Sequence, residues 1–254
     1  MKNYSKNIYE IETLGFTIVE NVFNSKEVSD LRSHLKTALE DDIKRFSGVS
    51  RKNPDLVVDL TIHHPIFLKA LDNDIIQNFL SQLLDEGSIL YSYTSTILRP
   101  VVASAVHNMH VDTNKFIPNY ITGIVMTIPL EDFTNENGAT LYLPGSQNLS
   151  TVPSEETFSK YALSTERKAG DVLFFNPRVF HRAGNNNTSQ IRYGLTAYAT
   201  RSFFKQRFDF PRMIPKESLN GLSDRLINFL GYNARVPESL EQYYLPAEER
   251  LYKL

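Results

Sequence analysis

The sequence predicts a mainly β fold with flanking helices, arranged as a sandwich or a jelly roll. From Ser88 to about residue 200, short runs rich in β-branched and aromatic residues recur between turn residues, with no helical pattern between them. Before Ser88, apolar residues recur at three- and four-residue spacing, which is typical of amphipathic helices. This order indicates a β-rich core with helices packed around it.

The composition is that of a folded enzyme or binding domain. The chain has 254 residues, of which 41% are hydrophobic and 22% are charged, and its mean hydropathy is -0.29. There is no repeat at solenoid spacing and no low-complexity linker. We expect a single domain over residues 1–254, with a helical N-terminal part at about 20–87, a jelly-roll core at about 88–200 and a C-terminal extension at 201–254.

The charge balance favours a small partner. The formal net charge is -2, from 27 basic and 29 acidic residues, so no overall field would attract nucleic acid or an anionic membrane. The N-terminus lacks the apolar stretch of a secretion signal, and the longest apolar run, "ITGIVMTIPL", is too short to span a bilayer. We therefore expect a cytoplasmic protein that binds a small-molecule substrate; its oligomeric state is left open.

The absence of cysteine narrows the chemistry. Without any cysteine, the chain has no disulfides, no thiolate nucleophile and no cysteine-bound zinc or iron-sulfur centre. Any metal must therefore be held by nitrogen and oxygen atoms.

Helical patterns occur on both sides of the β-rich centre. The segment "NSKEVSDLRSHLKTALEDDIKRF" begins with Asn24 and Ser25 as N-cap candidates and predicts a long amphipathic helix. The segment "NDIIQNFLSQLLDEG" predicts a second helix that ends at Gly87. In the tail, "SLNGLSDRLINFLGY" is the best helical candidate, and we expect it to pack on the outside of the barrel.

The predicted strands follow one another closely. An early extended piece, "FTIVE", precedes the long helix. The main runs are "SILYSYTSTIL", "ITGIVMTIPL", "ATLYLPG", "YALSTER", "DVLFFN", "RVFHRA" and "IRYGLTAYAT".

Two of the six histidines lie in "HNMHVDT", residues 107–113. If this stretch is extended, His110 and Asp112 point to one side and His107 to the other. A His-x-Asp pair offers one imidazole nitrogen and one carboxylate oxygen to the same ion. A third ligand from a distant strand would complete a facial triad that leaves open positions on iron(II).

The segment "AGDVLFFNPRVFHRAGNNNTSQIRYGLTAYATR" supplies a candidate third ligand, His181, and a notable arginine, Arg192. The turn "GNNNTS" must reverse the chain, as a hairpin or as a corner between sheets, and returns Arg192 towards the end that carries His181. Alternation places Arg192, Gly194, Thr196 and Tyr198 on one face and apolar residues on the other. An arginine that points into a barrel needs an anion, and its planar fork suits a carboxylate.

Four segments in this order resemble the phytanoyl-CoA dioxygenase family of iron(II)- and 2-oxoglutarate-dependent oxygenases. They are "HVD", "NGATLYLPGSQ", "AGDVLFFNPRVFHRAG" and "IRYG". The N-terminal segment "LGFTIVENVFNSKEVSDLR" also resembles the family, so the resemblance covers about residues 12 to 200. It implies a double-stranded β-helix, a cupin-like jelly roll, together with iron(II), 2-oxoglutarate and dioxygen as cofactor and cosubstrates.

Carried over by motif position, the resemblance implies that His110, Asp112 and His181 are the iron ligands and form the catalytic centre. It also implies that Arg192 binds the distal carboxylate of 2-oxoglutarate and that the hydroxyl of Thr127 assists it. Halogenating relatives replace the aspartate by a small residue, so its retention implies hydroxylation or a related oxidation, with release of succinate and carbon dioxide.

This chain departs from the family pattern at two positions near the triad. Ala183 lies where some members have a serine that reaches the cosubstrate. Met109 replaces the usual aromatic residue before the His-x-Asp pair. These departures concern contacts around the triad, not the triad itself.

The substrate side of the site is less specific in sequence. The polar, proline-containing segment "DTNKFIPNYIT" predicts a lid beside the open iron positions. Candidate substrate contacts are Asn114 and Tyr120 in this lid, and His107 and Arg178 near the triad. Because there is no strong basic patch for a nucleotide phosphate, a natural-product intermediate or an amino-acid derivative is favoured over an acyl-CoA.

Two other classes of protein fit the pattern. A cupin-like metal enzyme of the isomerase type would not use 2-oxoglutarate and would be indifferent to Arg192. A non-catalytic jelly-roll binding module would show no dependence on iron.

Overall fold

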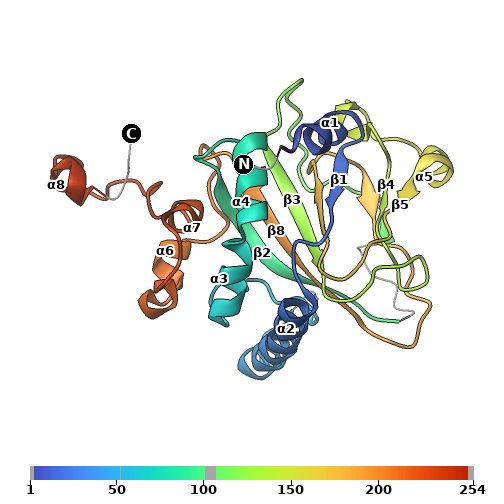
Figure 1. Ribbon diagram of the computed structural model, residues 1–254, viewed down its shortest axis with the longest axis horizontal. Coiled ribbons are helices and arrows are strands. Elements are labelled where there is room, and N and C mark those ends of the chain that lie inside the picture. The colour runs from blue at the N-terminus through green and yellow to red at the C-terminus, as the bar shows by residue number, and fades with distance from the viewer. Residues whose placement is uncertain (1–2, 52, 101–106, 251–254) are drawn as a thin grey trace.

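The computed structural model describes residues 3–51, 53–100 and 107–250 and confirms the jelly roll with helices outside it (Figure 1). A five-stranded antiparallel sheet has the order β1-β6-β3-β8-β2, and a three-stranded sheet has the order β5-β4-β7. No ladder between these strands joins the two sheets, so the barrel is open along its sides. The strands are β1 (Phe16–Val19), β2 (Ile89–Leu98), β3 (Gly123–Pro129), β4 (Leu141–Tyr142), β5 (Leu163–Ser164), β6 (Val172–Phe175), β7 (His181–Arg182) and β8 (Arg192–Thr200).

The two faces of β8 have different surroundings, as the alternation predicts. Leu195, Ala197 and Ala199 are fully buried in the main hydrophobic core. The opposite face carries Arg192 and Tyr198, and Tyr198 packs against a second apolar cluster. One face of the large sheet therefore supports the fold, and the other faces the interior between the sheets.

Helices α3 (Pro65–Leu71) and α4 (Asp74–Leu83) cover the outer face of the large sheet (Figure 1). The ring of Phe79 lies 4.3 Å from that of Phe174 in β6, measured between centroids. The predicted end of this helix at Gly87 is wrong, since the C-cap is Leu84. The chain leaves the helix there because Arg201 donates hydrogen bonds to the Leu84 carbonyl and to the Asp85 carboxylate.

Helix α2 (Ser25–Arg45) confirms the predicted long helix. The side chain of Asn24 accepts hydrogen bonds from the N–H groups of Lys26 and Glu27, and the carboxylate of Glu27 accepts from the N–H of Asn24. This capping box satisfies amide groups that would otherwise lack partners. The sequence does not predict α1 (Ser5–Thr13) or α5 (Glu155–Tyr161).

The C-terminal extension packs outside the barrel, beside β2 (Figure 1). The predicted helix is interrupted at Gly221, whose φ of 77° is in the left-handed region. A 3-10 turn, η3 (Lys216–Leu219), precedes Gly221, and α7 (Asp224–Phe229) follows it. Leu226 and Phe229 of α7 are buried in the main core. The other short elements are η2 (Ser146–Asn148), α6 (Phe210–Met213), α8 (Leu240–Tyr243) and η4 (Ala247–Glu249).

A separate apolar cluster fills the space between the sheets. The Tyr142 ring of β4 lies 5.1 Å from that of Phe16 and 5.0 Å from that of Phe175, between centroids. Val125, Leu173 and Val179 complete this cluster. Within the residues that the structure describes, no helix combines the length and the apolar character needed to cross a membrane.

Candidate active site

His110, Asp112 and His181 converge at the open side of the inter-sheet space. Their potential ligand atoms all lie within 4.8 Å of one another. The Nε2 atom of His110 is 3.8 Å from Oδ1 of Asp112, and Nε2 of His181 is 3.9 Å from the same oxygen. Two imidazole nitrogens and one carboxylate oxygen form a ligand set suited to a divalent first-row metal.

The second nitrogen of each imidazole faces a backbone carbonyl. Nδ1 of His110 lies 2.9 Å from the carbonyl oxygen of Asn108, and Nδ1 of His181 lies 3.0 Å from that of Val179. Because a carbonyl only accepts, each Nδ1 carries the proton and each Nε2 presents its lone pair. Such contacts orient metal-binding histidines, so these residues fit a metal held at Nε2.

His181 is the buried member of the set. Its ring stacks on Tyr142 with centroids 5.3 Å apart and meets the edge of Phe175 at 4.9 Å. Burial lowers its pKa, and the Asp112 carboxylate opposes this shift. Burial therefore favours the neutral imidazole that binds a metal, while the more exposed His110 and Asp112 face the opening.

The local backbone differs from the extended strand that the parity argument assumed. Residues 107–113 contain no strand, and His110 forms only an isolated bridge to His181. Asp112 is turned towards the histidines because its N–H donates to the carbonyl of Pro177 at 2.8 Å. The sequence predicted that the side chains of His110 and Asp112 point to the same side. In the structure they do so because the loop that carries them is hydrogen-bonded to Pro177, not because it is a strand. His107 is outside the metal-ligand group.

Arg192 is the first residue of β8, and only 3% of its surface is exposed. Its guanidinium lies over the Phe133 ring, 4.1 Å from the centroid, and donates to the Gly138 carbonyl. Its Nε atom is buried without a hydrogen-bond partner. Burial lowers its pKa to about 9, and the positive charge of Arg167 adds to this effect. A buried cation with neutral partners indicates an anion-binding position.

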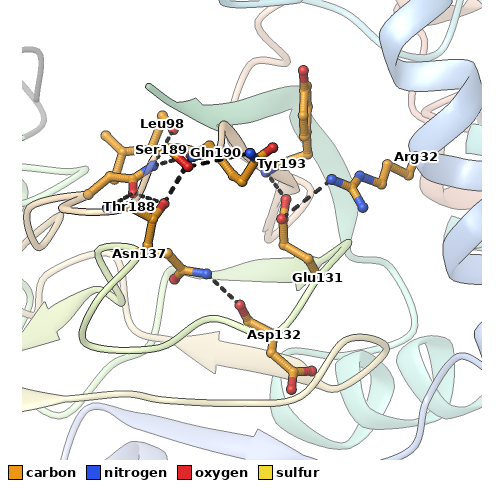
Figure 2. A network of polar contacts seen from close by, with 10 residues as sticks. Arg32, Leu98, Glu131, Asp132, Asn137, Thr188, Ser189, Gln190 and Tyr193 are labelled. Atoms are coloured by element: carbon orange, nitrogen blue, oxygen red, sulfur yellow. Dashed lines mark hydrogen bonds and ion pairs between the residues drawn. The ribbon is translucent and has the colours of Figure 1, made fainter. Parts of the chain in front are cut away.

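A polar network fixes the start of β8. Glu131 lies between Arg32 and Tyr193 (Figure 2); its carboxylate accepts the backbone N–H of Tyr193 at 2.6 Å and meets the Arg32 guanidinium at 3.5 Å. In the "GNNNTS" turn, the buried Asn186 donates to the carbonyls of Leu98 and Gln190. Because β7 and β8 belong to different sheets, this turn is a corner and not a hairpin. The network therefore determines where Arg192 enters the interior.

Thr127 is buried on β3, the strand next to β8 in the large sheet. Its hydroxyl accepts a hydrogen bond of 2.7 Å from Nη2 of Arg167, not from Arg192. Arg167 is 5% exposed. Sequence reasoning missed Arg167 because it occurs in the charged run "TERK", which is usually a solvated face. In the structure, buried Thr165 and Arg167 alternate with exposed Glu166 and Lys168, but all four residues are polar, so the sequence gives no signal of this alternation.

The predicted lid borders a cavity of about 390 Å³. Tyr120 and Arg178 line it, together with Phe116, Gln147 and Asn148. The Arg178 guanidinium lies 5.1 Å from the Phe116 ring centroid and donates to the carbonyl of Leu149 at 2.6 Å. Asn114 and His107 are not among the residues that line this cavity.

Comparisons with known proteins identify the family and support the fold. The family model for phytanoyl-CoA dioxygenase matches residues 11–194. A dioxygenase from Gibberella moniliformis, FUM3, is 30% identical over 255 residues, covering 89% of this chain and 81% of the relative.

Two solved structures share the fold. The first is EctD from S. alaskensis with 2-oxoglutarate and 5-hydroxyectoine, with a TM-score of 0.67 and 16% identity, covering 78% of this chain and 76% of that one. The second is SnoK, a non-heme α-ketoglutarate-dependent carbocyclase from nogalamycin biosynthesis, with a TM-score of 0.62 and 18% identity, covering 78% of this chain and 84% of that one. Because the family model spans most of the chain, the protein belongs to the phytanoyl-CoA dioxygenase family and is an oxidoreductase of the dioxygenase class.

Proposed function

We propose that the protein is an iron(II)- and 2-oxoglutarate-dependent dioxygenase that hydroxylates, or otherwise oxidises, a small organic molecule. The observation that carries this proposal is the convergence of His110, Asp112 and His181 within 4.8 Å in the same interior as a buried arginine without an acidic partner. A metal-ligand set beside an anion-binding arginine matches a metal that must be bound together with a dicarboxylate.

Each group of site residues has its own role in this proposal. His110, Asp112 and His181 would hold iron(II) through two imidazole nitrogens and one carboxylate oxygen. When bound, iron(II) together with 2-oxoglutarate and dioxygen would supply the oxidation, with release of succinate and carbon dioxide. Arg192 binds the distal carboxylate of the cosubstrate and so sets its direction relative to the metal. The aromatic cluster around Tyr142 excludes water from the inner side.

The substrate class rests on the cavity and on the relatives. A cavity of about 390 Å³ lies at the small end of the range for ligand sites, about 300–1,000 Å³. Its lining combines aromatic and polar side chains and includes none of the three metal-ligand residues. Tyr120 and Arg178 are proposed to contact the substrate from this cavity, beside the metal centre. Two proteins of the same fold act on, or are bound to, small metabolites by their descriptions. A natural-product intermediate or an amino-acid derivative is therefore favoured. Asn114 and His107, which do not line the cavity, are candidate contacts on their sequence positions alone.

The test is cosubstrate turnover. Iron-loaded protein is incubated with 2-oxoglutarate and a library of amino acids, acyl thioesters and metabolites, and succinate release and oxygen uptake are followed. The expected result is succinate formation coupled to one substrate class in the wild-type protein and in His64→Ala, and none in His181→Ala. Turnover that does not require 2-oxoglutarate would favour the isomerase-type alternative. Folded protein that releases no succinate under any condition would contradict the proposal.

A further inference from the structure

Arg167 and Arg192 form a pair of buried arginines around one phenylalanine. The Arg167 guanidinium lies 4.7 Å from the Phe133 ring centroid, and that of Arg192 lies 4.1 Å from it. Arg167 donates to the carbonyl and hydroxyl of Thr165 and to the hydroxyl of Thr127. All these acceptors are neutral, and the same is true of the carbonyl that Arg192 meets.

The two buried guanidinium groups of Arg167 and Arg192 would be stabilised by a bound anion. Burial lowers the pKa of Arg167 to about 10 and that of Arg192 to about 9, so both remain protonated near neutral pH. The Nε atom of each is buried without a partner. The Asp171 carboxylate raises the pKa of Arg167 and the Glu131 carboxylate raises that of Arg192, but neither outweighs burial. A buried charge whose hydrogen-bond partners are all neutral is costly, and an anion bound by the two guanidinium groups would offset that cost.

The fold holds this pair in place through Phe133. The N–H of Phe133 donates to the carbonyl of Arg167 at 2.8 Å, and the N–H of Arg167 donates back at 2.9 Å. Phe133 also packs on Gly194, where a Cβ atom would lie 2.9 Å from Cζ of Phe133. The glycine of "IRYG" therefore leaves room for the ring that carries both guanidinium groups.

We propose that Arg167 is a second cosubstrate-binding residue, which holds the distal carboxylate of 2-oxoglutarate jointly with Arg192 and with Thr127. This inference rests on the proposed function and deepens it. A carboxylate has two oxygens with about four lone-pair sites, so two guanidinium groups can both donate to it. Because Oγ1 of Thr127 accepts from Arg167, its own proton is directed to another acceptor, and the carboxylate supplies one.

A purely structural role for Arg167 makes a different prediction. In that case the guanidinium only ties Thr165, Thr127 and Phe133 together, and its loss would loosen the pocket for any 2-oxoacid. If Arg167 binds the distal carboxylate, its loss weakens only ligands that carry this carboxylate. Comparing 2-oxoglutarate with 2-oxobutyrate, which lacks the distal carboxylate, separates the two cases.

The experiment measures the affinities of both 2-oxoacids for iron(II)-loaded protein under anaerobic conditions, by calorimetry and by absorption of the iron complex. We expect Arg167→Leu to weaken 2-oxoglutarate about tenfold to hundredfold, as for a lost hydrogen bond to a charged group, and to change 2-oxobutyrate less than about twofold. Arg192→Leu should show the same selectivity with a larger loss. Arg167→Lys, which keeps the charge without the fork, should fall between Arg167→Leu and wild type.

Equal weakening of both ligands in Arg167→Leu, or unchanged 2-oxoglutarate affinity, would overturn the inference and leave the proposed function intact. If Arg167→Leu does not fold, the same comparison in Arg167→Lys and Thr127→Val decides the matter. Wild-type protein that binds iron but no 2-oxoglutarate would overturn the proposed function, and the inference with it.

Discussion

The backbones of His110 and His181 are joined by two hydrogen bonds of 3.0 Å, in which each N–H donates to the carbonyl of the other residue. Two imidazoles from distant parts of the chain thereby have a fixed separation, with ring centroids 4.3 Å apart. The loop that carries Asp112 is bound to the turn before His181 through Pro177. These backbone contacts thus fix the relative positions of the three candidate ligands.

The stacking of Tyr142 on His181 should support metal affinity. We expect Tyr142→Leu to weaken iron(II) binding about tenfold or more, because the ring that orients the imidazole is lost. Tyr142→Phe keeps the stacked ring and should bind iron(II) with roughly wild-type affinity. Anaerobic metal titration checks both variants, and equal affinities for the two would contradict an orienting role.

Asn186 should be important for both stability and cosubstrate binding. It is 2% exposed, and its side chain bonds the carbonyls of Leu98 and Gln190 and the N–H and hydroxyl of Thr188. Asn186→Ala should lower the free energy of unfolding by about 2 kcal/mol, since buried partners lose their hydrogen bonds. It should also weaken 2-oxoglutarate binding, because the turn positions Arg192. Asn185→Ala, at the exposed neighbouring residue, is the matched control. Equal free energies of unfolding for Asn186→Ala and Asn185→Ala, measured with denaturant, would contradict a role for the Asn186 hydrogen bonds.

Gly194 should tolerate no side chain. A Cβ atom there would lie 2.8 Å from Cγ2 of Thr96 and 2.9 Å from Cζ of Phe133. We expect Gly194→Ala to cost about 1–3 kcal/mol of stability, as for overpacking, and to weaken 2-oxoglutarate binding by displacing Phe133. Gly48→Ala, whose Cβ would meet nothing within 4 Å, is the control. Wild-type cosubstrate affinity in Gly194→Ala would contradict the role given to Phe133.

Asp59 should give the unfolding free energy a distinctive pH dependence. Its Oδ1 accepts the N–H and hydroxyl of Thr61, while Oδ2 is buried without a partner. Burial raises its pKa above the ordinary value of 3.8, and the bonds from Thr61 oppose the shift only in part. A raised folded-state pKa means that the native state binds the proton more tightly, so stability is lost as pH rises through the raised value.

Relative to Asp59→Asn, the wild-type protein should therefore lose stability between pH 3.8 and the raised pKa. Urea unfolding of both proteins across the acidic range measures the difference, with the exposed Asp41→Asn as a comparison carboxylate. A difference between wild type and Asp59→Asn that is constant with pH would show that Asp59 has the same pKa in both states.

The sequence predicted the parts of the molecule that depend on local patterns. The cap at Asn24 and the apolar spacing behind it predict α2 almost to the residue. Alternation predicts which face of β8 enters the core. Ordered motifs predicted His110, Asp112, His181 and Arg192 as candidates, and the structure brings the first three together.

The parts that were missed depend on long-range contacts. The early end of α4 depends on Arg201, more than a hundred residues away in the chain. The burial of Arg167 depends on its pairing with Phe133, which cannot be read from a run of charged residues. The direction of Asp112 depends on the carbonyl of Pro177, which lies in a separate turn.

If His110, Asp112 and His181 hold iron(II), 2-oxoglutarate whose distal carboxylate is bound by Arg192 should coordinate the same ion. The most direct measurement is the visible absorption spectrum of the protein after anaerobic addition of iron(II) and 2-oxoglutarate. We expect a charge-transfer band in wild type and in His107→Ala, and its loss in His181→Ala and in Arg192→Ala. A folded, iron-loaded wild-type protein without this band, or a band that persists unchanged in His181→Ala, would contradict the account.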